Sequence, residues 1–150
     1  MAFGDRVCLF LKERDMRKAG LVGLALGLLI LAGGCSLSPE EKVAREQSLK
    51  QTVDNFTALA TQGDFNGIYG MTDGNFDSAD SLKTNLMKSW VQDATLTGGQ
   101  IASMAWINDS TAKVKLNWIF QAQSVQSHSS ETFIWSFKGS TWKFKGRSLR

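Results

Sequence analysis

The sequence predicts an α+β domain in which helices come first and a four-stranded antiparallel sheet follows. Before Thr95 apolar residues recur every three or four positions, as they do on one face of an α-helix. After Gly98-Gly99 apolar and polar residues alternate, as they do along a half-buried strand. The segments between the alternating runs are short enough for hairpins, which makes neighbouring strands antiparallel. We expect the helices to pack on one face of a curved sheet.

The first helix is expected over residues 38–62. Ser38 suits the N-cap, Pro39 suits the first helical position, and Glu41 completes a capping box with Ser38. Gly63 supplies the left-handed residue that ends many helices. One face of this helix is apolar at helical spacing and consists of Leu49, Val53, Phe56 and Ala60.

Two further helical segments are expected before the sheet. Residues 64–76 are rich in Gly, Asn and Asp, which predicts a short helical turn and then a loop. Residues 77–94 predict a second long helix that ends near residues 95–99. Its apolar residues recur every four positions and are Leu82, Leu86 and Trp90. Its candidate N-caps are Asp77, Ser78 and Asp80.

Four consecutive strands are expected at residues 100–108, 111–121, 133–138 and 142–145. The second of these alternates apolar residues with Lys, Asn and Gln, so one of its faces should lie in the core. Gly139-Ser140 predicts a two-residue turn between the last two strands. The polar run at residues 121–130 fits either a loop or the outer ends of two long, bent strands.

An apolar segment before this domain predicts a signal peptide. Residues 19–34 are uncharged, follow two cationic residues, and are too short and glycine-rich for a membrane-spanning helix, which needs about 20 apolar residues. Small residues stand directly before Cys35, as a cleavage site requires. A plain transmembrane anchor is the alternative. Met16 begins a conventional signal peptide, so it is a second candidate for the start of translation.

The motif Leu-Ala-Gly-Gly-Cys at residues 31–35 resembles the lipobox of bacterial lipoproteins. The resemblance implies that residues 1–34 are a lipoprotein signal peptide and that residues 35–37 form an acylated anchor. Acyl chains such as palmitate on Cys35 would hold the protein in a membrane of the cell envelope. Ser36 implies, by the same resemblance, the outer membrane, with the domain facing the periplasm.

The order of elements over residues 38–150, with the closing sequence ETFIWSFKGSTWKFKGRSL, resembles the NTF2-like (cystatin-like) superfamily. The resemblance implies a curved sheet that wraps around a helix and leaves a groove. Members of that superfamily include enzymes, ligand-binding proteins and interaction modules, so the fold alone does not define a function.

Five aromatic residues are candidates for lining that groove, and several of them are equally candidates for the core. They are Tyr69, Trp90, Trp106, Trp118 and Trp135. We expect Trp118 and Trp135 in the core, and Trp90 and Trp106 at a pocket or at the surface. Such a groove would bind a small apolar ligand or an envelope protein.

No motif of an enzyme, cofactor site or metal site occurs in the expected domain. His128 is its only histidine and it has no cysteine after Cys35, so we predict no metal ligands, and we expect its acidic residues to serve as caps and turns. From Cys35 onward twelve basic residues face eleven acidic ones, and this near-neutral charge gives no reason to expect nucleic acid as a partner.

The sequence therefore predicts a lipid-anchored envelope protein with a non-catalytic binding domain. One alternative is a small SnoaL-like hydrolase or isomerase that uses Asp54 or Asp64 with Tyr69 or His128. Another is a scaffold subunit of an envelope complex, marked by an apolar patch on the outer face of the sheet. The basic residues of the tail predict either contact with an anionic polymer or lipid, or a solvated edge strand; they are Lys143, Lys145, Arg147 and Arg150.

Overall fold

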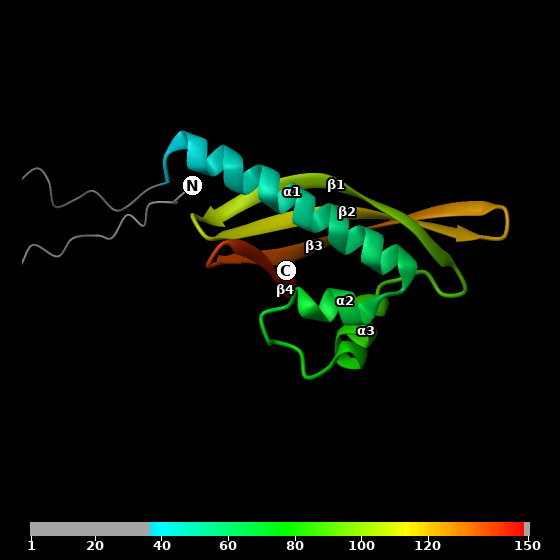
Figure 1. Ribbon diagram of the computed structural model, residues 1–150. Coiled ribbons are helices and arrows are strands. Elements are labelled where there is room, and N and C mark those ends of the chain that lie inside the picture. Colours follow the sequence, from blue (N-terminus) through cyan, green and yellow to red (C-terminus); the bar gives the residue numbers. More distant parts are fainter. Residues whose placement is uncertain (1–36, 149–150) are drawn as a thin grey trace, which may run out of the picture. The chain divides into compact units, whose positions relative to one another are not determined.

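Residues 37–148 form an α+β domain in the computed structural model, which describes this range. Three helices precede four strands (Figure 1). The elements are α1 (Pro39–Gln62), α2 (Phe65–Gly70), α3 (Ala79–Met87), β1 (Thr95–Asn108), β2 (Thr111–Ala122), β3 (Val125–Lys138) and β4 (Thr141–Arg147). The sheet is antiparallel in the order β1-β2-β3-β4, so the predicted class is confirmed. The leader, Cys35 and their predicted processing lie outside the described residues.

Helix α1 is the element that local sequence determines most completely. Its capping box is present, because the Glu41 N–H donates to Ser38 Oγ at 3.2 Å and the Ser38 N–H donates to Glu41 Oε2 at 2.9 Å. Gly63 ends the helix with a φ of 72°. The predicted apolar face is buried, and Thr57 joins it. Both ends and the buried face of this helix are therefore confirmed.

Helix α3 ends at Met87, several residues before the predicted end, and Trp90 lies in the turn that follows. The reason is a contact with the other end of the chain. One nitrogen of the Arg147 side chain donates to the Leu86 carbonyl at 2.5 Å and to Ser89 Oγ at 2.7 Å. A cation that binds the last carbonyls stabilises a helix C-terminus at that point. Ser78 is the N-cap among the three candidates.

Strand β1 begins earlier than predicted, so the two glycines lie inside the strand and do not precede it. A Cβ built on Gly99 would stand 2.8 Å from the Trp118 ring, so the absence of a side chain leaves room for that ring. The polar run at residues 121–130 forms the outer ends of two long strands and not a loop. Strands β2 and β3 extend through it and are joined by a turn at Gln123-Ser124, with Gln123 at a φ of 50°.

Replacing Gly99 with alanine is expected to destabilise the domain by about 1–3 kcal/mol, because the new methyl group would collide with a buried ring that cannot move freely. Gly98 provides a matched control. The nearest atom to a Cβ there is Ile119 Cδ1 at 3.8 Å, so Gly98→Ala should change stability by no more than about 0.5 kcal/mol. Urea unfolding of the two variants tests this, and equal losses would contradict it.

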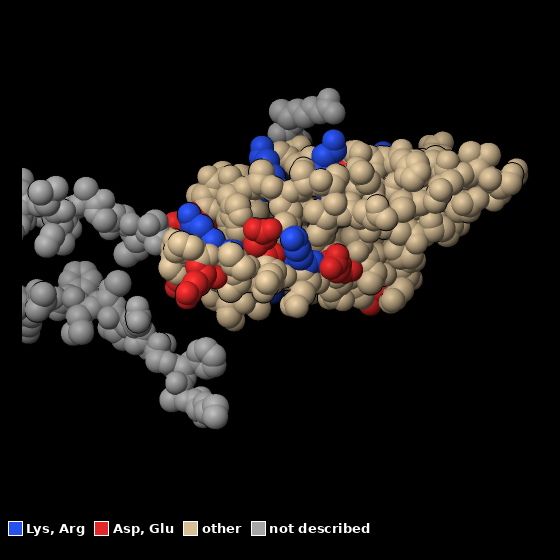
Figure 2. All heavy atoms as spheres, turned by 90° about the horizontal axis from the view of Figure 1, so that it is seen from above, with Lys and Arg blue, Asp and Glu red and all other residues tan. Residues whose placement is uncertain are grey.

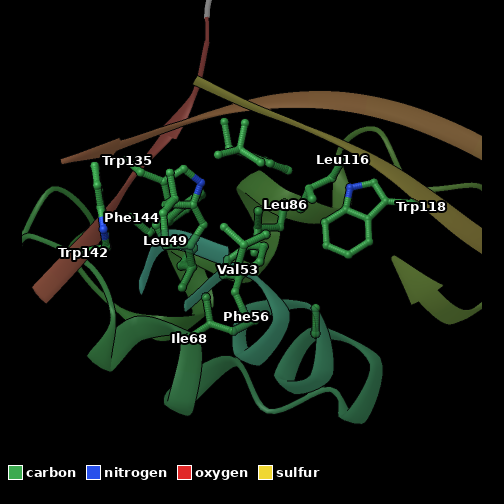
Figure 3. Packing of buried hydrophobic residues seen from close by; sticks show 14 of the residues in the cluster. Leu49, Val53, Phe56, Ile68, Leu86, Leu116, Trp118, Trp135, Trp142 and Phe144 are labelled. Carbon is green, nitrogen blue, oxygen red and sulfur yellow. The ribbon is translucent and has the colours of Figure 1, made fainter. Parts of the chain in front are cut away.

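The core lies between the helices and one face of the sheet (Figure 3). Phe56 is at its centre and its ring lies 5.0 to 6.1 Å, between centroids, from four other rings. Those rings belong to Trp118, Phe133, Trp135 and Phe144. The alternation predicted for β2 is observed, since Ala112, Val114, Leu116, Trp118 and Phe120 are buried. Lys113 and Lys115 alternate with them and are exposed.

Candidate functional site

The five aromatic candidates do not share one site. Trp118 and Trp135 are fully buried in the core. Trp90 is half-buried and packs beside Phe65, Trp118 and Phe120, and Tyr69 packs against the edge of the core. Trp106 is on β1, where 38% of it is exposed. The space predicted as a groove between α1 and the sheet is thus occupied by aromatic side chains.

The residues named for a hydrolase or isomerase are also dispersed. Asp64 caps α2 by accepting the Gly67 N–H at 2.9 Å, and Asp54 is exposed on α1. His128 is exposed and pairs with Ile119 across the sheet, whereas Glu131, three residues later, is buried on the opposite face. Within residues 37–148 no group of three or more His, Cys, Asp or Glu side chains is placed to hold a metal ion. None of the helices in this range has the length and apolar character needed to cross a membrane.

A buried polar cluster links β2, β3 and β4 to the end of α3. Glu131 accepts a hydrogen bond from Trp118 Nε1 at 3.3 Å, and its other oxygen lies 3.2 Å from an Arg147 nitrogen. Arg147 faces inward because the register shifts between Ile134 and Trp135, opposite Gly146 at a φ of 117°. Burial raises the pKa of Glu131, while the charge of Arg147 and the Trp118 hydrogen bond oppose that rise. Sequence reasoning did not find this pair, since no local pattern indicates the bulge.

A second ion cluster attaches the loop after α2 to the sheet. Lys138 and Lys145 lie 2.5 and 2.7 Å from the same oxygen of Asp73. The Asn75 amide donates to the Lys145 carbonyl, and the Phe144 N–H donates to the Met71 carbonyl at 2.9 Å. The basic residues of the tail therefore differ in their surroundings. Lys145 and Arg147 pair with carboxylates of the domain, and Lys145 is also exposed on β4, which is an edge strand as one of the two alternatives predicts.

Asp73→Asn should weaken the domain at neutral pH and have little effect in strong acid. The hydrogen bonds from Lys138 and Lys145 lower the pKa of Asp73. A lowered folded-state pKa stabilises the protein above the unfolded-state pKa, and this stability is lost as pH falls through the folded-state pKa. Urea unfolding of wild type and Asp73→Asn at neutral pH and in strong acid measures the difference in stability. Asp54→Asn is the control, because Asp54 is exposed and makes no ion pair within the described residues.

A polar hollow of about 580 Å³ opens beside the end of β4. It is lined by Lys113, Lys115, Ser130, Glu131, Thr132, Arg147 and Ser148. Lys113 and Lys115 point away from the helices, since their neighbours in β2 are the buried ones. Neither lysine makes an ion pair in the part of the chain that is described. The hollow thus offers positive charge and hydroxyl groups on the face of the sheet that the helices leave open.

An apolar surface lies where the described chain begins. A hollow of about 180 Å³ brings Leu37 next to Trp106 and Ile107 at the end of β1, and Ile107 is 50% exposed. We name these three residues the terminal patch. Val43, 56% exposed, lines a neighbouring hollow with Pro39 on the first turns of α1. The sequence signal for this surface is weak: Ile107 follows Trp106 directly and interrupts the alternation of β1.

No protein-family model matches the chain, and no curated protein sequence matches it. The solution structure of a SEC-C motif containing protein from Rhodopseudomonas palustris is similar, with 16% sequence identity and a TM-score of 0.45. The similar part covers 62% of this chain and 72% of that chain.

Proposed function

We propose that this protein is a lipid-anchored component of a bacterial cell envelope and that its domain binds an envelope protein without chemical turnover. The observation that carries the proposal is the position of Cys35. It ends a lipobox-like motif, and the described domain begins two residues later, at Leu37. Acylation at Cys35 would therefore hold the domain at a membrane surface, which in our proposal is the periplasmic face of the outer membrane.

The NTF2-like (cystatin-like) assignment is part of the same proposal. It is supported by three helices followed by a β1-β2-β3-β4 meander, with α1 across one face of the sheet (Figure 1). In this domain the interior is filled by Phe56 and the rings around it (Figure 3), which favours a protein partner at the surface over a small apolar ligand inside.

The polar hollow is the binding site that we assign to the partner. Lys113 and Lys115 would pair with acidic side chains, and the hydroxyls of Ser130 and Thr132 would accept or donate hydrogen bonds. The scaffold alternative predicts an apolar patch on the outer face of the sheet. Lys113 and Lys115 lie there, and the exposed Trp106 and Ile107 lie at the end of β1.

Labelling of cells with radioactive palmitate tests the anchor. Wild-type protein is expected to incorporate label and Cys35→Ala to lose it, because the thiol is the proposed acceptor. Incorporation by Cys35→Ala equal to that of wild type would overturn the anchor. Cys8→Ala is the control variant, since it retains Cys35 and should label like wild type.

Site-specific photocrosslinking tests the binding face. A photoreactive residue at Lys115 is expected to give one adduct of defined mass in intact cells, whereas the same residue at Lys50 should give none. Lys50 is a suitable control because it is exposed on α1 and forms only a surface ion pair with Glu46. Replacing Lys113 with glutamine beside the photoreactive residue at position 115 should reduce the yield of the adduct, because it removes the remaining lysine of the hollow. Adducts of equal yield from both positions would contradict the assignment.

A further inference from the structure

We infer that the terminal patch is a membrane-docking surface that enters the interfacial layer of the bilayer holding the acyl chains of Cys35. This inference rests on the proposed anchor. It adds that the domain lies against the membrane in one orientation and does not move freely on a tether.

The length of chain between anchor and domain supports the inference. Cys35 precedes Leu37 by two residues, so their Cα atoms are at most about 7 Å apart. Leu37 lines the same hollow as Trp106 and Ile107. An acylated Cys35 would therefore place the patch within the depth that interfacial side chains reach, about 5–10 Å.

The chemistry of the patch suits that layer. Tryptophan prefers the membrane interface, where its ring contacts acyl chains and its N–H remains near water. Trp106 is 38% exposed, and Ile107 beside it is 50% exposed. Val43 and Pro39 are further exposed apolar residues on the first turns of α1. Exposed apolar side chains at one end of a domain are a feature of surfaces that bind membranes or proteins.

The patch is held in place before any contact with lipid. The Trp106 ring packs against Trp142 at 5.5 Å between centroids, and Trp142 Nε1 donates to the Arg45 carbonyl at 3.1 Å. Arg45 in turn donates to the Asp109 carbonyl at 2.7 Å, and its guanidinium lies 4.3 Å from the centre of the Phe137 ring. The β1–β2 turn is thereby fixed to α1. Docking would need little ordering of these side chains, which favours it.

Charge around the patch is mixed. Lys42 and Asp109 line the same hollow, and Glu40 lines the neighbouring one. Figure 2 shows basic and acidic side chains intermixed over much of the domain, while its tapered end carries neither on this face. Residues 116–130, which form the outer part of the β2–β3 hairpin, contain no Lys, Arg, Asp or Glu. We therefore expect docking by apolar insertion, with little dependence on anionic lipid.

The geometry also predicts which end of the domain faces the periplasm. The start of α1 and the β1–β2 turn lie at one end of the sheet, and the β2–β3 turn lies at the other (Figure 1). With the terminal patch on the membrane, the uncharged hairpin points away from it.

The test attaches residues 35–150 to vesicles chemically. Cys35 is the only cysteine in this segment, so a maleimide lipid in phosphatidylcholine vesicles couples there alone. The segment should fold by itself, because every residue of the core cluster lies between Leu49 and Phe144. Lipids brominated on the upper acyl carbons quench nearby tryptophan. We expect quenching in wild type, its loss in Trp106→Phe, and its persistence in Trp90→Phe.

The outcomes separate this inference from the proposed anchor. Absence of quenching in coupled wild-type protein, or quenching that Trp106→Phe leaves unchanged, overturns the docking surface, because the anchor is imposed by the coupling. Failure of palmitate labelling in cells overturns the natural anchor instead. Ile107→Ser provides a variant with all tryptophans in place, and its quenching should fall; circular dichroism confirms folding of each variant. Replacing part of the phosphatidylcholine with phosphatidylglycerol should not change the result.

Discussion

Arg147→Ala is expected to lower the free energy of unfolding by about 2–3 kcal/mol, somewhat below the loss typical of a fully buried ion pair. The Arg147 side chain is 25% exposed and its partner Glu131 is 7% exposed. Truncation would leave the Glu131 carboxylate buried without a cation and would remove the donor from the Leu86 carbonyl in the last turn of α3. Urea unfolding followed by tryptophan fluorescence measures the loss.

Two control variants test whether the loss of stability comes from the unpaired charge of Glu131. Lys143→Ala removes another cation from the same strand that makes no ion pair in the described part of the chain, and it should change stability by no more than about 0.5 kcal/mol. Adding Glu131→Gln to Arg147→Ala should restore part of the lost stability, because the amide carries no charge. A double variant less stable than Arg147→Ala would reject this account.

The Glu131–Arg147 pair also makes the stability of the domain depend on pH, and the direction of that dependence follows from the pKa of Glu131. Burial raises the pKa of Glu131 in the folded state, so the native protein binds more protons than the unfolded chain over the interval between the two pKa values. Stability contributed by this group is therefore present at low pH and is lost as pH rises through the folded-state pKa. Removing Arg147 should raise that pKa further. The deficit of Arg147→Ala relative to wild type should consequently be smaller in mild acid than at neutral pH, and Glu131→Gln should abolish the difference.

The sequence could predict those elements whose ends are determined by neighbouring residues. The Ser38 capping box and Gly63 determine both ends of α1, and the alternation of apolar residues identifies β2. The errors in the predicted bounds lie between residues 87 and 99, where contacts with residues distant in the sequence influence the structure. Arg147 binds the end of α3 from 61 positions away, and the Trp118 ring lies where a Cβ at position 99 would be crowded. Such contacts have no local signature.

Only some residues of the candidate site could be predicted from the sequence. Cys35 belongs to a contiguous motif, so the sequence alone predicts it as a lipidation site. The sequence could not assign every tryptophan to the core or to the surface. Strand β1 carries three register shifts, and each shift changes the face of the sheet on which the following side chains lie. The terminal patch combines Leu37 with Ile107, which are far apart in the chain. Only the folded arrangement brings them together.

Phe56→Ala is expected to be among the most damaging substitutions, with a loss of about 3–5 kcal/mol, because it removes a ring from the centre of the core and leaves a cavity. Phe56 is fully buried and contacts four other rings. Val43→Ala on the same helix is the control. Val43 is 56% exposed, so its truncation should change stability by no more than about 0.5 kcal/mol.

The Phe56 cavity also tests whether the domain holds a small apolar ligand. If aromatic side chains fill the interior of wild type, benzene should not raise its melting temperature. An apolar cavity that is closed to water can bind such a molecule, so benzene should raise the melting temperature of Phe56→Ala. Stabilisation of wild type by benzene would show that its interior has room for a ligand, and the surface-binding proposal would then lose its main support. Stabilisation of the variant alone would instead direct the search for a partner to the exposed faces of the sheet.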